Sequence, residues 1–476
     1  MEHREVDLVV IGAGAVGENV ADRAVHGGLT VAMVEAELVG GECSYWACMP
    51  SKALLRVGAA TRAARAVAGV GDIGAIDPAA AFARRDRITH AWDDASQVEW
   101  AHGAGIEVVR GHGRLAGERR VIVRATDGTE TEFVARHAVA VATGSAALLP
   151  DIPGLADLEP WTSREATSAK SAPRRLAILG GGVVGSEMAT AYADFGTTVT
   201  LVARGGLLAG QEPFAGDRVA AALRSRGVDL RTGVEATGAR REGTDKVLEL
   251  SDGTEVRADE ILVAVGRVAR TGDLGVETIG LEPGAWLDVD DTLRVRGHDW
   301  LYAVGDVNHR ALLTHQGKYQ ARAAGDVIAA RATGGTVDDD AWGRHVATAD
   351  HTMVPQVTFT DPEVASVGLT AAAAERAGHR IRVLDYDLSW IAGASVVADD
   401  FAGWARAIVD DERDVLLGMT LVGPGVGEMI HAATIAVVGE VPLARLWHAV
   451  PPYPTLSEVW LRLLEADGRR SGAVGS

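Results

Sequence analysis

The order of apolar and polar positions near the start of the chain is typical of a strand, a tight turn and a helix. Residues 6–11 form a short apolar run, and the letters G-A-G-A-V-G follow at 12–17. A helical pattern continues to about Gly27, and a second apolar stretch at 30–34 ends before Glu35. Short apolar runs beside turn signals predict buried strands, and the 3.6-residue period between them predicts an amphipathic helix.

The same order returns in the middle of the chain. An apolar run at 176–179 precedes G-G-G-V-V-G at 180–185, a helical pattern reaches about residue 195, and a strand pattern follows at 198–202. The second set of glycines repeats the first with a constant offset of 168 positions: Gly12, Gly14 and Gly17 correspond to Gly180, Gly182 and Gly185. Two such turns in strand and helix context indicate two dinucleotide-binding units.

The remaining segments predict smaller elements and a further domain. Three short stretches are typical of antiparallel inserts, and they lie at 106–111, 121–124 and 247–250. From about residue 354 strands alternate with amphipathic helices, as in 404–409, 416–422 and 427–438. This change of pattern predicts a separate C-terminal domain.

Composition narrows the function classes. The chain has 476 residues and is 47% hydrophobic, enough for several domains with their own cores. Its net charge of -19 opposes binding to phosphate backbones, so we expect no nucleic-acid partner. Because no 18-residue apolar run occurs and positions 2–5 are polar, we expect a cytoplasmic protein without a membrane partner.

The two turns differ at the position that selects the dinucleotide. Glycines let the backbone approach a pyrophosphate, which rests on amides at the helix N-terminus. At the end of the following strand the first unit has Glu35, whose carboxylate can accept hydrogen bonds from ribose hydroxyls. The second unit has Ala203 there, followed by Arg204, a cation that can pair with a 2′-phosphate. We therefore expect NADPH, with NADH less favoured; the alternative for Arg204 is an ordinary solvated arginine.

Cys43 and Cys48 are the two cysteines of the chain. Two cysteines are too few for a disulfide scaffold or a four-sulfur zinc site, and we expect no metal centre. They form either a redox pair or two partly buried reduced thiols. Their position beside the first dinucleotide unit favours the redox pair.

Six further segments form a series along the chain. They are G-G-E-C-S-Y-W-A-C-M-P-S-K at 40–52, A-T-G-S at 142–145, A-V-G-R at 264–267, Y-A-V-G-D at 302–306, V-P-Q-V-T-F-T-D-P at 354–362 and Y-P-T-L-S-E at 453–458. In this order they resemble the motifs of the class I pyridine nucleotide-disulfide oxidoreductases, which include dihydrolipoamide dehydrogenase, glutathione reductase and mercuric reductase. The resemblance covers nearly the whole chain and implies an FAD-containing, NAD(P)H-dependent enzyme.

The resemblance also assigns roles to residues. Cys43 would face the substrate, Cys48 would lie against the flavin, and Lys52 would lie near flavin N5 with Glu187 as its acidic partner. The residues implied in FAD binding are Gly12, Gly14, Gly17, Glu35, Thr143, Gly144, Asp306 and Thr314, with Asp306 on the ribityl chain. Those implied in NADPH binding are Gly180, Gly182, Gly185, Arg204 and Gly266. We expect His315 to be structural rather than catalytic.

The implied fold class is α/β, with two Rossmann-like dinucleotide-binding domains, one for FAD and one for NAD(P), and a C-terminal α+β dimerisation domain. We expect an FAD-binding domain at 1–150, an NAD(P)-binding domain at 151–270, the remainder of the FAD-binding or central domain at 271–348, an interface domain at 349–466 and a disordered tail at 467–476. By resemblance we also expect a homodimer.

One catalytic position departs from the family pattern. Disulfide reductases of this family have a histidine before the C-terminal proline, where this chain has Tyr453, while the glutamate that follows is present as Glu458. A histidine titrates near ~6.5 and can serve as a base near neutral pH, whereas a tyrosine titrates near ~10. His448 or His431 could replace the base, but their surroundings favour helix packing.

Three functions remain open from the sequence. The first is an NAD(P)H-dependent reductase of a disulfide that we cannot name, with proton chemistry altered by Tyr453. The second is a reductase of quinones or soft metal ions, because thiolates are preferred ligands of such ions and mercuric reductase also has a tyrosine here. The third is a non-enzymatic flavoprotein that senses redox state.

Overall fold

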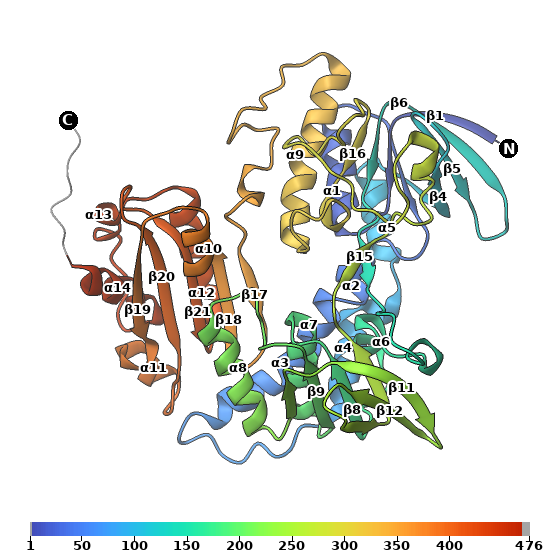
Figure 1. The fold of residues 1–476 in the computed structure, drawn as a ribbon. Helices are drawn as coiled ribbons and strands as arrows, with labels where there is room; N and C mark the ends of the chain where they lie inside the picture. The colour runs from blue at the N-terminus through green and yellow to red at the C-terminus, as the bar shows by residue number, and fades with distance from the viewer. Residues whose placement is uncertain (1, 469–476) are drawn as a thin grey trace. The chain divides into compact units, whose positions relative to one another are not determined.

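The computed structural model of the chain describes residues 2–468 (Figure 1). These residues form two compact units, each made of three chain segments. The first unit holds the residues up to Pro50, Arg85–Leu148 and Gly266–His351, and the second holds Ser51–Arg84, Leu149–Val265 and the residues from Thr352 onward. The domain boundaries expected near 150, 270 and 348 stay predictions.

A seven-stranded sheet forms the centre of the first unit. The strand order is β3-β2-β1-β6-β5-β4, and β16 pairs with β6. The parallel strands are β1 (Glu2–Ile11), β2 (Val31–Glu35), β3 (Glu107–Arg110), β6 (Glu130–Val141) and β16 (Leu301–Ala303). The antiparallel strands are β4 (His112–Leu115) and β5 (Arg120–Arg124). The apolar run at 6–11 is therefore a buried central strand, as predicted.

Two helices of the first unit, α1 (Ala15–His26) and α9 (Thr314–Thr333), pack against each other. Val20, Ala21 and Ala24 of α1 are buried in the same core as the strands. Small side chains on both helices allow a close approach, which brings the N-terminal half of α9 beside the glycine turn that precedes α1. Shorter helices of this unit are α2 (Gly41–Tyr45) and α5 (Ala95–Gly103).

One predicted insert is part of the main sheet instead. Residues 106–111 were expected to be antiparallel, but β3 pairs in parallel with β2. The chain reaches β3 through α5, and a helical crossover returns the next strand in the same direction. The other two predicted inserts, at 121–124 and 247–250, are antiparallel as expected.

The second unit contains a four-stranded parallel sheet in the order β10-β9-β8-β14. Its strands are β8 (Arg175–Leu179), β9 (Thr198–Ala203), β10 (Asp229–Thr232) and β14 (Glu260–Val263). A three-stranded antiparallel sheet follows β10 and consists of β11 (Ala236–Glu242), β12 (Asp245–Leu250) and β13 (Glu255–Ala258). The helices of this part are α6 (Ser163–Ser168), α7 (Val183–Asp194) and α8 (Pro213–Ser225). The second strand–turn–helix pattern is confirmed.

The C-terminal part of the second unit is a five-stranded antiparallel sheet. Its strands in order are β17 (Gln356–Thr358), β18 (Glu363–Gly368), β21 (Leu416–Gly423), β20 (Trp404–Asp410) and β19 (Ile381–Asp387). The helices are α10 (Ala371–Arg376), α11 (Ala392–Val397), α12 (Val426–Val438), α13 (Leu443–Leu446) and α14 (Val459–Asp467). The tail predicted from 467 overlaps the last residue of α14, and its part from 469 onward lies outside the described residues.

A short ribbon in the first unit joins two of the family-like motifs. β7 (Ser145–Ala147) pairs antiparallel with β15 (Arg267–Ala269), and the Leu148 amide donates to the Gly266 carbonyl at 2.9 Å. The segment by which the chain leaves this unit is therefore hydrogen-bonded to the segment by which it returns. Within residues 2–468, no helix has the length and apolar character needed to cross a membrane.

Candidate active site

The two glycine turns have the same backbone geometry. Gly12 and Gly180 both have a positive φ, of 102° and 113°. A Cβ on Gly17 would collide with the Gly12 carbonyl oxygen, and a Cβ on Gly185 would collide with the Gly180 carbonyl oxygen. Each turn therefore requires glycine at both ends, which leaves the amides at the start of α1 and of α7 accessible to a pyrophosphate.

Glu35 closes the first turn from the end of β2. Its carboxylate accepts the Ala13 amide at 2.7 Å and the Glu37 amide at 2.8 Å. Burial raises the pKa of the Glu35 carboxyl above its usual range. Glu35 thus lies beside the turn, where the sequence placed a ribose-binding carboxylate, and its contact with the ribose stays a prediction.

Asp306 lies in the turn η4 (Gly305–Asn308) of the first unit. The Ser145 hydroxyl donates to its carboxylate at 2.5 Å, and the Arg267 guanidinium lies 3.7 Å away. Burial raises the pKa of the Asp306 carboxyl, while the Ser145 hydrogen bond and the Arg267 charge oppose that rise. The A-T-G-S, A-V-G-R and Y-A-V-G-D motifs therefore meet at one carboxylate.

Thr143 offers a test of whether the first unit fits FAD. Its hydroxyl oxygen is buried and has no hydrogen-bond partner among residues 2–468. Buried hydroxyls are usually hydrogen-bonded, so this one points to a group that the chain itself does not supply. With the open glycine turn and the acceptor carboxylate of Asp306, the residues of this unit fit a bound flavin dinucleotide.

The two cysteines lie at the junction of two helices. Cys43 is in α2, and Cys48 is the first residue of α3 (Cys48–Arg65). Both are half-buried thiols, and the Cys48 sulfur lies 3.3 Å from the Thr314 hydroxyl at the start of α9. A hydrogen bond to the Cys48 sulfur, together with burial, raises the pKa of the Cys43 thiol well above its usual value.

Lys52 and Glu187 form an ion pair inside the second unit. The Lys52 ammonium lies 2.7 Å from the Glu187 carboxylate, whose side chain is 3% exposed. The other carboxylate oxygen accepts the Phe359 amide at 3.0 Å, and the ammonium lies 4.9 Å from the centre of the Phe359 ring. The structure thus brings together the two residues that the resemblance paired, and it adds Phe359, which the sequence analysis missed.

The residues expected to bind NADPH lie at the ends of elements. Gly182 precedes α7, and Arg204 is exposed directly after Ala203, the last residue of β9. A Cβ on Gly182 would meet no atom within 4 Å, so the space above the second turn is open. The turn fits a second dinucleotide. Gly266 has a φ of 155° and belongs to the first unit.

The C-terminal segment does not join Tyr453 to Glu458 within this chain. Tyr453 is 74% exposed, whereas Glu458 is 4% exposed. One Glu458 carboxylate oxygen pairs with Arg462, and the other has no hydrogen-bond partner in the described part of the chain. The role of either residue in catalysis stays a prediction.

Three histidines expected to be structural lie on the surface of the chain. His315, His431 and His448 are all exposed. The prediction of helix packing is therefore wrong for His431, on the outer side of α12, and for His448, which follows α13. Apolar neighbours in sequence suggested burial, but neighbouring residues of a helix point in different directions.

Comparison with models of known protein families shows to which family the chain belongs. A family model described as pyridine nucleotide-disulphide oxidoreductase matches residues 6–326, and the dimerisation domain of that family matches residues 354–463. The chain belongs to this family. It is accordingly an FAD-dependent oxidoreductase of the disulfide reductase class that uses a pyridine nucleotide, and the matched dimerisation domain supports a homodimer. The predicted fold class and the resemblance are confirmed, and the non-enzymatic alternative is not supported.

Several curated members of the family are similar over nearly the whole chain. Mercuric reductase from Acidithiobacillus ferrooxidans is 32% identical over 96% of this chain and 81% of its own length. Mercuric reductase from Streptomyces lividans is 33% identical over 96% of this chain and 95% of its own length. Dihydrolipoyl dehydrogenase from Thermus scotoductus is 32% identical over 97% of both chains. Relatives with two different activities are thus equally similar to this chain.

Solved structures agree in fold. The Cu(II) complex of the HOCl-induced flavoprotein disulfide reductase RclA from Escherichia coli has a TM-score of 0.83 and 24% identity, covering 97% of this chain and 99% of that one. LpdA from Mycobacterium tuberculosis also has a TM-score of 0.83 and 24% identity, covering 98% of this chain and 100% of that one. At this identity the likeness concerns the fold alone.

The sequence analysis did not identify one charged residue near the first glycine turn. Glu18 follows Gly17 in α1, and one of its carboxylate oxygens is buried without a hydrogen-bond partner in residues 2–468. Burial raises the pKa of Glu18 to about 7; the charge of Lys318 on α9 opposes the rise, and that of Glu35 adds to it. No motif marks this position, because its environment comes from α9, about 300 residues away in the chain.

Proposed function

We propose that the chain is an NADPH-dependent reductase that passes two electrons to the Cys43–Cys48 pair and from there to a small disulfide. The observation that carries this proposal is the two half-buried cysteines at the junction of α2 and α3, with the Cys48 sulfur 3.3 Å from the Thr314 hydroxyl, in the unit that fits FAD. Bound FAD would supply the hydride acceptor and deliver the two electrons to the disulfide.

The thiol chemistry balances over one cycle. NADPH and one proton supply two electrons and two protons, and the Cys43–Cys48 bond breaks to two thiols. The Cys43 thiolate then attacks the substrate disulfide, which forms a mixed disulfide and releases one substrate thiol. Cys48 attacks the Cys43 sulfur, releases the second substrate thiol and restores the bond. Cys43 must lose its proton for the first attack, and its burial beside Cys48, which raises the pKa of the Cys43 thiol, opposes that loss.

Lys52 and Asp306 would act as fixed charges toward FAD. Glu187 holds the Lys52 ammonium in one orientation and offsets its desolvation. Such an ammonium would favour negative charge that develops on a nearby acceptor. Asp306, held by Ser145, would accept hydrogen bonds from ribityl hydroxyls.

Arg204 supports NADPH over NADH. It is exposed at the end of β9 beside Ala203, where a carboxylate would otherwise repel a 2′-phosphate. A charge-assisted bond from its guanidinium to that phosphate would favour NADPH.

A soft metal ion is the second candidate acceptor. Curated mercuric reductases are 32–33% identical to this chain over 96% of its length. Two thiolates at Cys43 and Cys48 suit such an ion, and reduction of a divalent ion to the metal needs two electrons and no base. Tyr453 in place of histidine is compatible with this route, and it also leaves quinones as acceptors that need no thiol protonation.

An acceptor panel separates these candidates. NADPH oxidation is measured with small disulfides, mercuric ion and quinones, for the wild type and for Cys43→Ser. We expect disulfide reduction in the wild type and its loss in Cys43→Ser. Faster turnover of mercuric ion, lost in the same variant, would favour the second candidate. Quinone turnover that survives Cys43→Ser, with no disulfide or metal turnover in the wild type, would contradict dithiol chemistry altogether.

A further inference from the structure

Asp350 is a buried carboxylate in the first unit that the proposed reaction does not use. It is 6% exposed, and both of its oxygens accept amide groups from α9. The Gln316 side-chain amide donates to one oxygen at 2.8 Å, and the Gln320 side-chain amide donates to the other at 2.8 Å. Both glutamines are buried, and Gln320 is fully so.

The oxygen of the same Gln320 amide group holds the turn that carries Asp306. Its carbonyl oxygen accepts the Gly305 backbone amide at 2.8 Å and the Asn308 side-chain amide at 2.8 Å. Gly305 and Asn308 are the first and last residues of η4, and Asp306 lies between them. Asn308 is fixed in turn, because its amide also donates to the Ala303 carbonyl at 3.0 Å.

The direction of this chain of hydrogen bonds is set at Asp350. An ionised carboxylate can only accept hydrogen bonds, so the NH₂ group of Gln320 must point toward it. The carbonyl oxygen of Gln320 must then point toward Gly305. In the reverse orientation the NH₂ group would face two N–H donors and the carbonyl oxygen would face a carboxylate, so several buried groups would lose their partners at once.

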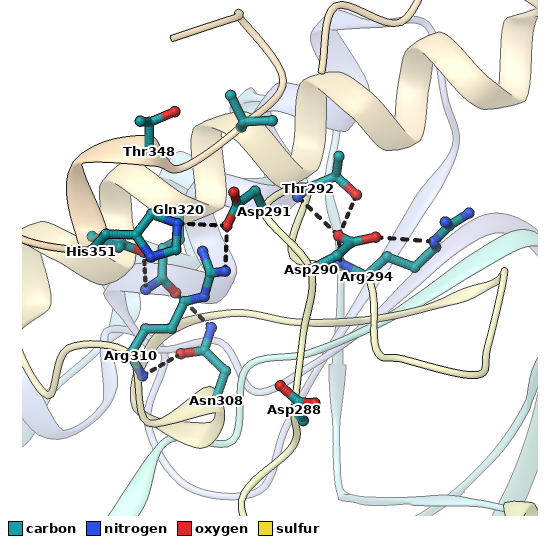
Figure 2. Close-up of polar contacts among 12 residues, drawn as sticks. Asp288, Asp290, Asp291, Thr292, Arg294, Asn308, Arg310, Gln320, Thr348 and His351 are labelled. Carbon is teal, nitrogen blue, oxygen red and sulfur yellow. Dashed lines mark hydrogen bonds and ion pairs between the residues drawn. The ribbon is translucent and has the colours of Figure 1, made fainter. Parts of the chain in front are cut away.

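Nearby charges make an ionised Asp350 tolerable. The Arg310 guanidinium stabilises its negative charge, and Arg310 and His351 converge on Asp291, at 2.5 Å and 2.9 Å (Figure 2). Burial raises the pKa of the Asp350 carboxyl, and the two glutamine hydrogen bonds act against that rise. Figure 2 also shows the contact between Arg310 and Asn308, in which the Arg310 backbone amide donates to the Asn308 side-chain oxygen at 3.0 Å. Arg310 is therefore tied to the last residue of the turn that carries Asp306.

We propose that Asp350 and Gln320 are positioning residues for FAD: the carboxylate fixes the direction of the Gln320 amide, which holds the Gly305–Asn308 turn and so aims Asp306 at the ribityl chain. The inference rests on the proposed role of Asp306 toward FAD. It predicts that the identities of the two side chains matter less than the direction of the hydrogen bond between them.

A reciprocal exchange of acid and amide tests that direction. The dissociation constant of FAD is measured by the fluorescence released when the holoenzyme is diluted, for Gln320→Glu, Asp350→Asn and the double variant. Gln320→Glu places two carboxylates in contact and should weaken FAD binding by about tenfold or more. In the double variant the new asparagine at 350 can donate to the new glutamate at 320, which still accepts from Gly305. Affinity should return to within about threefold of the wild type.

Gln316→Leu is the matched control. It removes a buried glutamine from the same helix and one hydrogen bond from Asp350, but leaves the Gln320 direction unchanged, so the FAD dissociation constant should change by less than about threefold. Failure of the double variant to recover, or wild-type affinity in Gln320→Glu, would overturn the inference. The Asp306→Ala background separates this from the proposed function: if Asp306→Ala leaves FAD affinity unchanged, the role of Asp306 is wrong. If it weakens FAD but Gln320→Glu still adds its full effect, the positioning route is wrong.

Discussion

Glu18 should make the stability of the chain fall as pH rises. Its pKa in the folded chain is about 7 because the carboxyl is buried, whereas its ordinary value is 4.5. A carboxyl whose pKa is raised by folding stabilises the folded state while it is protonated in both states, and this contribution is lost as pH rises from about 4.5 through 7. The full difference corresponds to about 3 kcal/mol in the free energy of unfolding, and most of it, roughly 2–3 kcal/mol, falls between pH 5 and pH 8.

The matched substitution is Glu18→Gln, which keeps the shape and removes the titration. Urea unfolding followed by tryptophan fluorescence at pH 5 and pH 8 gives the free energy of unfolding of both proteins. The loss on going to pH 8 should be smaller in Glu18→Gln by roughly 2–3 kcal/mol, so the variant should gain on the wild type at the higher pH. Lys318 opposes the effect, so Lys318→Met should enlarge it. Equal pH dependence in the wild type and Glu18→Gln would refute the reasoning.

Four further substitutions test the reaction. Arg204→Ala should lower kcat/KM for NADPH by an amount equivalent to roughly 1.5–3 kcal/mol and leave kcat/KM for NADH nearly unchanged. Equal losses with both nucleotides would show that Arg204 does not recognise the 2′-phosphate. The two-electron-reduced wild type should show a long-wavelength charge-transfer band, and Cys48→Ser should abolish it. Cys43→Ser has no disulfide to reduce, so it should show the band before any reduction, while its flavin is oxidised, and the reverse pattern would exchange the two sulfur roles. Tyr453→His should raise turnover of small disulfides about tenfold or more by supplying a base, with quinone turnover unaffected; no change with any acceptor would place Tyr453 away from the reaction.

The parts of the fold and of the site that could be predicted depend on short stretches of sequence. The two glycine turns follow from steric limits on residues a few positions apart, so Gly12, Gly17, Gly180 and Gly185 were identified together with their strands and helices. The Lys52–Glu187 pair was found through resemblance, because the two residues belong to different helices.

The features that the sequence analysis missed depend on contacts between segments that are distant in the chain. β3 was predicted to be an antiparallel insert because a short apolar run does not show in which direction its strand will pair. The crossover through α5 makes it parallel to β2. Glu18 and Asp350 are ordinary acids in the sequence, and their burial comes from the packing of α9. His431 and His448 were expected to pack because their neighbours are apolar, but α12 directs His431 outward and His448 lies in the exposed turn after α13.

Anaerobic reductive titration tests the central claim most directly. Dithionite is added to the FAD-loaded enzyme while the flavin spectrum is followed, and electrons are counted per flavin. If Cys43 and Cys48 form a disulfide that exchanges electrons with the flavin, the wild type should take up about four electrons and Cys43→Ser about two, because one two-electron centre has been removed. Uptake of two electrons by both proteins would contradict the account, since the cysteine pair would then hold none of the electrons.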